Sequence, residues 1–180
     1  RRQRQMCIRD SINIVQPSQT YAQPAQLFWN CGTACRGRFV PVTDSGDLST
    51  PMVGRGSAYA DIDNDGDLDV VITQNGRRAV LFRNEQMLGH HWLRIRLSGT
   101  RSNRNAIGAL VELSVDGEMQ RRVVMPTRSY LSQSELPVTF GLGSGRMPDQ
   151  LHIRWPDGEQ QTVPVPAVDV TMSIKQNDKP

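Results

Sequence analysis

The sequence lacks the features that define several classes of protein. Aromatic side chains make up only 6% of its 180 residues, and no apolar run approaches the roughly 18 residues of a membrane-spanning helix. The start shows no charged region, apolar region and cleavage site in series, so we expect any export signal to lie outside this sequence. With 15 Gly and 11 Pro, the chain is also too interrupted for a helical bundle or coiled coil. An all-β or loop-rich architecture is therefore the first expectation.

The excess positive charge comes from one end of the chain. Arg1, Arg2, Arg4 and Arg9, against Asp10, account for the formal net charge of +3, and the remaining acidic and basic residues balance. The segment Met6 to Ser11 also resembles a translation of the transposase adapter used in preparing DNA libraries. We expect residues 1–11 to be an artefact at the edge of a metagenomic fragment, or disordered; a genuine basic arm is the alternative. Without this segment the charge predicts no nucleic-acid partner.

Two cysteines remain once Cys7 is set aside. Cys31 and Cys35 are spaced CxxxC in a glycine-containing loop. A zinc site would need two further ligands, whereas a small disulfide loop in an oxidising compartment fits the spacing. The prediction is a Cys31–Cys35 disulfide, with two free thiols as the alternative.

A short repeat organises the first half of the chain. Leu27-Phe28-Trp29-Asn30 recurs as Leu81-Phe82-Arg83-Asn84. Between the copies lie short β-like runs near residues 38–42, 56–60 and 69–73, separated by turn residues that include Asn75-Gly76. This pattern is typical of one propeller blade. Because a single blade leaves its faces and edges open, we expect upstream blades of the same chain as its partners.

After Gly89 the pattern changes to strands of alternating polarity. Strands are predicted at residues 92–97, 108–115, 119–125, 137–142, 151–155, 161–165 and 168–174, with an Asp-Gly hairpin signal at 116–117. Such a series without helical periodicity predicts a β-sandwich-like domain, with a small barrel as the alternative. The expected domains are a propeller-blade region over 12–88, a C-terminal domain over 89–175 and a tail over 176–180.

The strongest chemical signal is an acidic loop. Its sequence is Asp61-Ile62-Asp63-Asn64-Asp65-Gly66-Asp67-Leu68-Asp69. Alternating carboxylates in a tight turn can converge on one Ca²⁺, which accepts six to eight oxygens. We expect the side chains of Asp61, Asp63, Asp65 and Asp69 as ligands, with the backbone carbonyl of Asp67; the alternative is an acidic turn without metal. Ile72 stands where an EF-hand needs a bidentate Glu, and the β-branched residues after the loop favour a strand.

These residues carry a family resemblance. The stretch from Gly54 to Gly76, with LFRN after it, resembles an FG-GAP or VCBS-type repeat, the calcium-binding blade of integrin-like propellers. Further blocks at residues 91–93, 102–109, 128–135, 140–143 and 155–158 resemble the ASPIC/UnbV domain. This order is similar to that of the cartilage acidic protein family and its bacterial relatives. The resemblance implies a secreted or surface-exposed calcium-binding protein without an assigned catalytic activity; the Cys31–Cys35 insert departs from the usual turn.

Other candidate sites are less specific. Asn103, Arg104, Asn105, Arg128 and Tyr130 carry groups that suit hydrogen bonding to a sugar or peptide. The alternative is that they tie down turns, with Arg128 pairing with Glu135. His90 and His91 belong to no metal-binding spacing, and their expected role is structural. No nucleophile elbow is present, and the scattered acids cannot be paired from sequence.

The expected function follows from these patterns. We expect an extracellular calcium-binding scaffold for adhesion or for binding a glycan or protein ligand, without catalysis, nucleic acid or a membrane span. The alternative is an enzyme or enzyme-associated protein acting on polysaccharide, with its catalytic groups outside this sequence. A pocket holding two carboxylates would favour the enzyme, whereas an exposed aromatic patch would favour binding.

Overall fold

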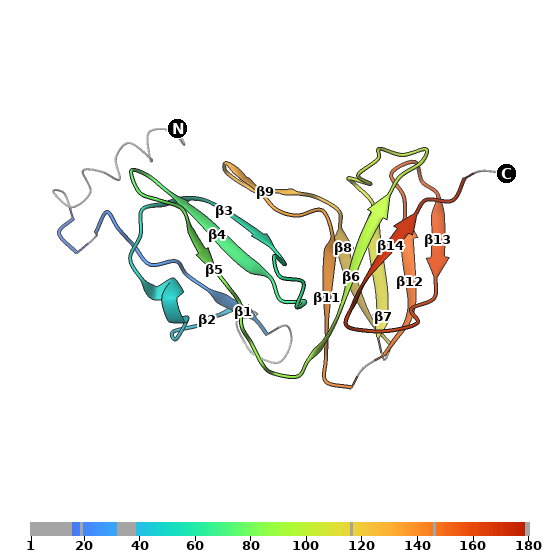
Figure 1. The fold of residues 1–180 in the computed structure, drawn as a ribbon, viewed down its shortest axis with the longest axis horizontal. Helices are drawn as coiled ribbons and strands as arrows, with labels where there is room; N and C mark the ends of the chain where they lie inside the picture. The colour runs from blue at the N-terminus through green and yellow to red at the C-terminus, as the bar shows by residue number, and fades with distance from the viewer. Residues whose placement is uncertain (1–15, 19, 32–38, 116, 146, 179–180) are drawn as a thin grey trace. The chain divides into compact units, whose positions relative to one another are not determined.

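The described residues form β-strands joined by turns (Figure 1). The structure is a computed structural model that describes residues 16–18, 20–31, 39–115, 117–145 and 147–178. Within these ranges there is no α-helix, only the 3₁₀ turn η2 (Gly46–Ser49), and no helix that could cross a membrane. The all-β expectation is confirmed, and the sheets are open. The expected artefact over residues 1–11 lies outside the described ranges.

The first part of the chain contains two small sheets. β1 (Phe28–Asn30) pairs antiparallel with β2 (Phe39–Pro41). A separate sheet has the order β3-β4-β5, with β3 (Gly54–Ala60), β4 (Asp69–Gln74) and β5 (Val80–Phe82). The predicted runs are thus strands, and the Asn75-Gly76 turn follows β4, with Gly76 at a φ of 68°. Their assignment to a propeller blade stays a prediction.

The second part contains two larger sheets. One has the order β11-β6-β14, and in it β6 runs antiparallel to β11 and parallel to β14. The other has the order β13-β12-β7-β8. A short hairpin of two strands, which the sequence did not predict, precedes β11. The bounds are β6 (His91–Ser98), β7 (Leu110–Val115), β8 (Glu118–Val123), β9 (Thr127–Ser129), β10 (Ser132–Gln133), β11 (Val138–Gly143), β12 (Pro148–Arg154), β13 (Gln160–Val163) and β14 (Val170–Lys175).

One apolar core joins these two sheets. In β6, β7 and β11 the apolar residues at alternate positions are buried, as in Leu93, Ile95 and Leu97 of β6. They share a cluster with Leu113 of β7, Phe140 of β11 and residues of β12 and β14. Since side chains of both sheets fill the same core, the sheets pack face to face as a β-sandwich. This outcome agrees with the sandwich-like domain expected from the alternation.

The buried side-chain amide of Gln176 links two loops of this domain by hydrogen bonds. Gln176, which is 1% exposed, accepts the N–H groups of Thr100, Arg101 and Ser102 through its Oε1. Its Nε2 donates to carboxylates in the turn between β12 and β13. The first residue of the expected tail is therefore part of the domain's hydrogen-bond network.

The contacts group the described residues into two units. Residues up to Ser57 group with 71–82, whereas residues 58–70 group with those from Arg83 onward. The acidic loop, at residues 61–69, therefore belongs to the same unit as the β-sandwich. The side chains that surround the loop are therefore sought in that unit.

Candidate functional site

The acidic loop is a tight turn between β3 and β4. Asp61 directly follows β3, and Asp69 is the first residue of β4. Asn64 and Gly66 have φ values of 63° and 96°, a left-handed conformation that Gly and Asn adopt more readily than other residues. These two positions fold the chain back, so that alternate side chains of the loop approach one another.

Three of the five predicted ligands meet in this loop. Asp61, Asp63 and Asp65 each place a carboxylate oxygen within 4.8 Å of the others. Asp61 is buried, and the other two are exposed. Such a cluster could hold a metal ion, and oxygen ligands of this kind suit a hard divalent cation.

Asp67 and Asp69 have other partners. Asp69 is 2% exposed, and its two oxygens accept the N–H groups of Ile62 at 3.0 Å and Asn84 at 2.9 Å. Asp67 accepts a hydrogen bond from Gln86. Asp69 therefore links the start of the loop to the segment that follows β5. The ligand roles predicted for Asp67 and Asp69 stay predictions.

A buried arginine of β6 lies against the loop. Arg94 Nη1 donates to Asp61 Oδ2 at 2.6 Å, and Arg94 Nη2 donates to Glu135. The side chains of Arg94 and Asp61 are 4% and 0% exposed. Burial raises the pKa of Glu135, although the Arg94 guanidinium acts in the opposite direction. The alternative pairing of Glu135 with Arg128 is wrong, because Arg94 takes that place and Arg128 is exposed.

Sequence reasoning missed Arg94, although a signal for it exists. Arg94 lies in an alternating strand, Trp92 to Leu97, whose apolar residues at 93, 95 and 97 enter the core. The residues between them project from the opposite face of the sheet. That face carries Trp92 and Arg94, both of which contact the acidic loop. The alternation could have predicted the face, but not the partner.

Polar atoms remain unpaired at the centre of this arrangement. Within the described part of the chain, Asp61 Oδ1, Arg94 Nε and Glu135 Oε1 are buried without a hydrogen-bond partner. A buried acceptor without a partner costs roughly 1–3 kcal/mol. Asp61 is a member of the three-carboxylate cluster, and a cation that reached its Oδ1 would satisfy that atom.

The outer carboxylates carry unbalanced negative charge. A hydrogen bond from the Asp67 N–H lowers the pKa of Asp65, but burial and the charges of Asp63, Asp67 and Asp61 raise it by more. Arg83 pairs with Asp63 and, at 3.1 Å, with Glu85. Asp63 is thus paired with Arg83, whereas like charges around Asp65 raise its pKa.

The backbone of the loop packs against the Trp92 ring at Gly66. A Cβ atom built at this position would lie 2.0 Å from atoms of the Trp92 indole. No side chain fits in that space, so the backbone of the loop rests directly on Trp92. The glycine thus serves two needs: the positive φ and the close approach.

The polar residues predicted to bind a ligand lie in two separate segments. Asn103 Oδ1 accepts the Ile107 N–H, and its Nδ2 donates to the Ile107 carbonyl, both at 2.8 Å. Its amide therefore stabilises the loop between β6 and β7. This agrees with the alternative that these residues tie down turns. Arg104 and Asn105 of that loop are exposed, as are Arg128 of β9 and Tyr130 of the following turn.

The predicted disulfide falls partly outside the described residues. Cys31 follows β1, is 6% exposed and is disulfide-bonded. Cys35 lies outside the described ranges, so its pairing with Cys31 stays a prediction.

His91 has a structural partner. His91 Nδ1 lies 2.7 Å from Asp169 Oδ2, and Asp169 Oδ1 accepts the Trp92 N–H at 3.0 Å. Desolvation raises the pKa of Asp169, but the hydrogen bonds from His91 and Trp92 lower it by more, so that the net shift is downward. This pair fixes the start of β6 beside the turn before β14.

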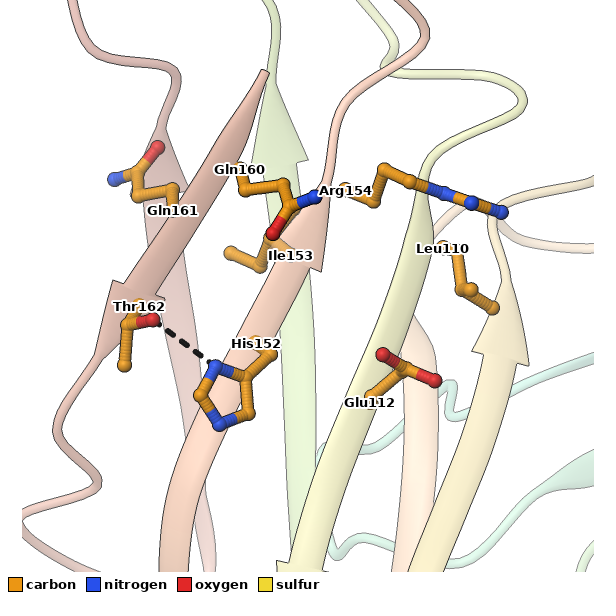
Figure 2. A pocket seen from close by; sticks show the side chains of 8 residues that line it. All are labelled: Leu110, Glu112, His152, Ile153, Arg154, Gln160, Gln161 and Thr162. Carbon is orange, nitrogen blue, oxygen red and sulfur yellow. Dashed lines mark hydrogen bonds between the residues drawn. The ribbon is translucent and has the colours of Figure 1, made fainter. Parts of the chain in front are cut away.

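A hollow lies on the outer face of β7, β12 and β13 (Figure 2). Its volume is about 180 Å³. Figure 2 shows a hydrogen bond between the His152 ring and the Thr162 hydroxyl, and Glu112 lies on the neighbouring strand. Glu112 accepts a hydrogen bond from Arg121. The hollow holds one carboxylate rather than the pair that would favour a hydrolytic enzyme.

The chain is similar in sequence to known proteins. Residues 99–180 match the family described as ASPIC and UnbV. The chain is also 32% identical to cartilage acidic protein 1 of Xenopus tropicalis over 126 residues, 67% of this chain and 19% of the relative. The human and mouse proteins of the same name are each 31% identical over 110 residues. The chain spans about a fifth of the length of these relatives or less.

Proposed function

We propose that this chain is the calcium-binding part of an extracellular, non-catalytic scaffold for adhesion or ligand binding. Its ion would be held by the side chains of Asp61, Asp63 and Asp65, with Asp69 and the Asp67 carbonyl completing the set. The observation that supports this most strongly is the buried Asp61 carboxylate, whose Oδ1 has no partner among the described residues. Ca²⁺ suits an irregular set of carboxylate and carbonyl oxygens better than Mg²⁺, which requires a near-octahedral shell.

The proposed role of the ion is to hold the loop on the β-sandwich. Arg94 already links Asp61 to Glu135, which precedes β11. A cation bound by the outer carboxylates would remove their mutual repulsion and leave Asp61 Oδ2 for Arg94. Calcium would therefore stabilise the contact between the loop and the C-terminal domain as well as the loop itself.

The remaining parts of the proposal concern partners and location. β1 and β2 carry large apolar side chains that are exposed. The exposed fractions are 50% for Phe28, 59% for Trp29 and 60% for Phe39. Such a surface suits burial against another sheet, and we assign it to a neighbouring propeller blade of the same longer chain. The similarity to cartilage acidic protein 1 and the CxxxC loop support an extracellular, oxidising location.

Calcium titration tests the proposal. We expect calorimetric heat on adding Ca²⁺, and at a hundredfold excess over Kd an increase of about 2.7 kcal/mol in the free energy of unfolding relative to chelator. Asp65→Asn should weaken calcium binding at least tenfold without lowering stability in chelator, because Asp65 is exposed and its pKa is raised by like charges.

Asp149→Asn is the matched control, since Asp149 is an exposed carboxylate of β12. It should bind calcium like the parent protein. Identical unfolding curves in calcium and chelator, with no heat of binding, would show that the loop is an acidic turn without metal.

A further inference from the structure

A cavity of about 290 Å³ lies beside the acidic loop, within the unit that contains the β-sandwich. Its walls come from three segments: the second half of the loop, the connection from Asn84 to Trp92, and β11. Of the proposed calcium ligands only Asp67 lines it, and none of the polar residues predicted from sequence does. Its volume is close to the lower end of ligand sites, about 300 Å³.

Glycines on β11 create the space. In the register between β6 and β11, Gly141 lies opposite Trp92 and Gly143 opposite His91. Phe140, between these glycines and Thr139, points into the core instead. A Cβ at Gly141 would meet no atom within 4 Å, and Gly141 does not have a positive φ. The backbone therefore does not require glycine at 141, yet the missing side chain leaves room beside Trp92.

Several polar groups that line the cavity have no partner within the described ranges. Thr139 Oγ1 is buried without a hydrogen bond. The Trp92 indole N–H, the Asn84 side-chain amide and the His90 ring make none of the side-chain hydrogen bonds found in this part of the chain. Together they offer donors and acceptors around one aromatic ring.

The charge of the lining narrows the class of ligand. No lysine or arginine lines the cavity, and its one carboxylate, Asp67, accepts a hydrogen bond from Gln86. An anion would meet the acidic loop without a counter-charge, and an apolar ligand would leave the hydroxyl, amide and imidazole groups unpaired. A neutral polyol ring presents C–H groups to the indole and hydroxyl groups to the polar rim.

We propose that this cavity binds one ring of a neutral saccharide, with Trp92, Asn84 and Thr139 as its principal contacts. This inference rests on the binding role in the proposed function and names its site and ligand class. Because Gly66 and Asp67 of the acidic loop form one wall, calcium bound to the loop would also order the saccharide site.

The test uses the full chain loaded with calcium. Methyl glycosides of glucose, galactose, mannose and N-acetylglucosamine are the probes, at millimolar concentration, with binding measured by saturation-transfer NMR. We expect at least one glycoside to bind, and Gly141→Leu, which fills the cavity, to weaken that binding at least tenfold. Gln160→Leu, an exposed position in the hollow of Figure 2, is the control and should bind like the parent.

A second variant covers the case in which Gly141→Leu does not fold. Asn84→Ala keeps the backbone N–H that Asp69 accepts and removes only the side-chain amide, so it should fold and still weaken binding. Absence of binding by all four glycosides, or unchanged affinity in both variants, would overturn the inference.

Calcium titration of the same samples separates the two proposals. Heat from calcium without glycoside binding would overturn the saccharide site and leave the calcium scaffold intact. Glycoside binding that is equal in calcium and chelator, with no heat from calcium, would support the saccharide site and reject the proposed role of the ion.

Discussion

The two contact units differ in how they bury apolar surface. Within the described ranges, the unit with the β-sandwich has a core of sixteen buried apolar residues, most of which lie on two facing sheets. In the other unit the buried apolar residues within the described ranges are Cys31, Met52, Val53 and Ile72, while Phe28, Trp29 and Phe39 are exposed. Two sheets can cover each other, whereas single sheets with apolar side chains on both faces need a further layer.

The acidic loop is held in place by polar contacts rather than by buried apolar surface. It contributes almost no apolar surface, yet it groups with the β-sandwich. Arg94, Asp69 and the contact of Gly66 with Trp92 hold it in place. Charge and hydrogen bonds thus join this loop to the unit with the large core, although in the sequence it lies among the strands of the other unit.

The largest effect is expected from the buried ion pairs. Arg94→Ala leaves Asp61 and Glu135 buried without their cation, so it should lower the free energy of unfolding by about 3–5 kcal/mol. Arg96→Ala is the matched control, because Arg96 lies on the same strand but is exposed, and it should stay within about 0.5 kcal/mol of the parent. Urea unfolding measures both variants; equal losses would show that Arg94 does not hold the loop.

A pair of leucines tests the difference between the two units. Leu113 is 0% exposed in the core of the β-sandwich, and Leu113→Ala should cost about 2–5 kcal/mol. Leu81, on β5 of the other unit, is 50% exposed, and Leu81→Ala should cost about 0.5 kcal/mol or less. Denaturant midpoints give the comparison, and a larger loss at Leu81 would mean that this unit is buried by a partner in solution.

Gly66 tests the contact between the loop and Trp92. Gly76→Ala, at a φ of 68° with open space around it, should cost about 1 kcal/mol for the backbone alone. Gly66→Ala has a similar backbone cost and also places a methyl group on the indole, which should add about 1–3 kcal/mol. Thermal unfolding of both variants checks this, and similar shifts in Tm would show that the loop does not rest on Trp92.

The smallest effect is the pH dependence that comes from Asp169. Its pKa is lowered in the folded chain, so its stabilising contribution is present above the pKa of the unfolded chain, about 4. It is lost as pH falls through the lower folded value. Asp169→Asn should therefore flatten the acid limb of a plot of stability against pH, and Asp149→Asn serves as the control. A curve unchanged by Asp169→Asn would contradict the role of the His91 pair.

Much of the fold was predictable from local pattern. Alternating residues such as Leu93, Ile95 and Leu97 predicted strands, and Asn75-Gly76 predicted a turn, because both depend on neighbours in the chain. The hairpin of β9 and β10 was missed because its strands are two and three residues long and show no alternation. The alternative partner for Glu135 was wrong because an exposed Arg128 and a buried Arg94 are equally basic in the sequence.

The sequence by itself determined the strands, the acidic turn and the carboxylates that could hold an ion, since spacing along the chain sets these local features. Only the tertiary structure decided that Arg94 pairs with Asp61 and Glu135, that Trp92 supports Gly66, and that Gly141 opens a cavity beside that ring. These contacts join residues far apart in sequence, and their energies depend on burial, which local pattern does not specify.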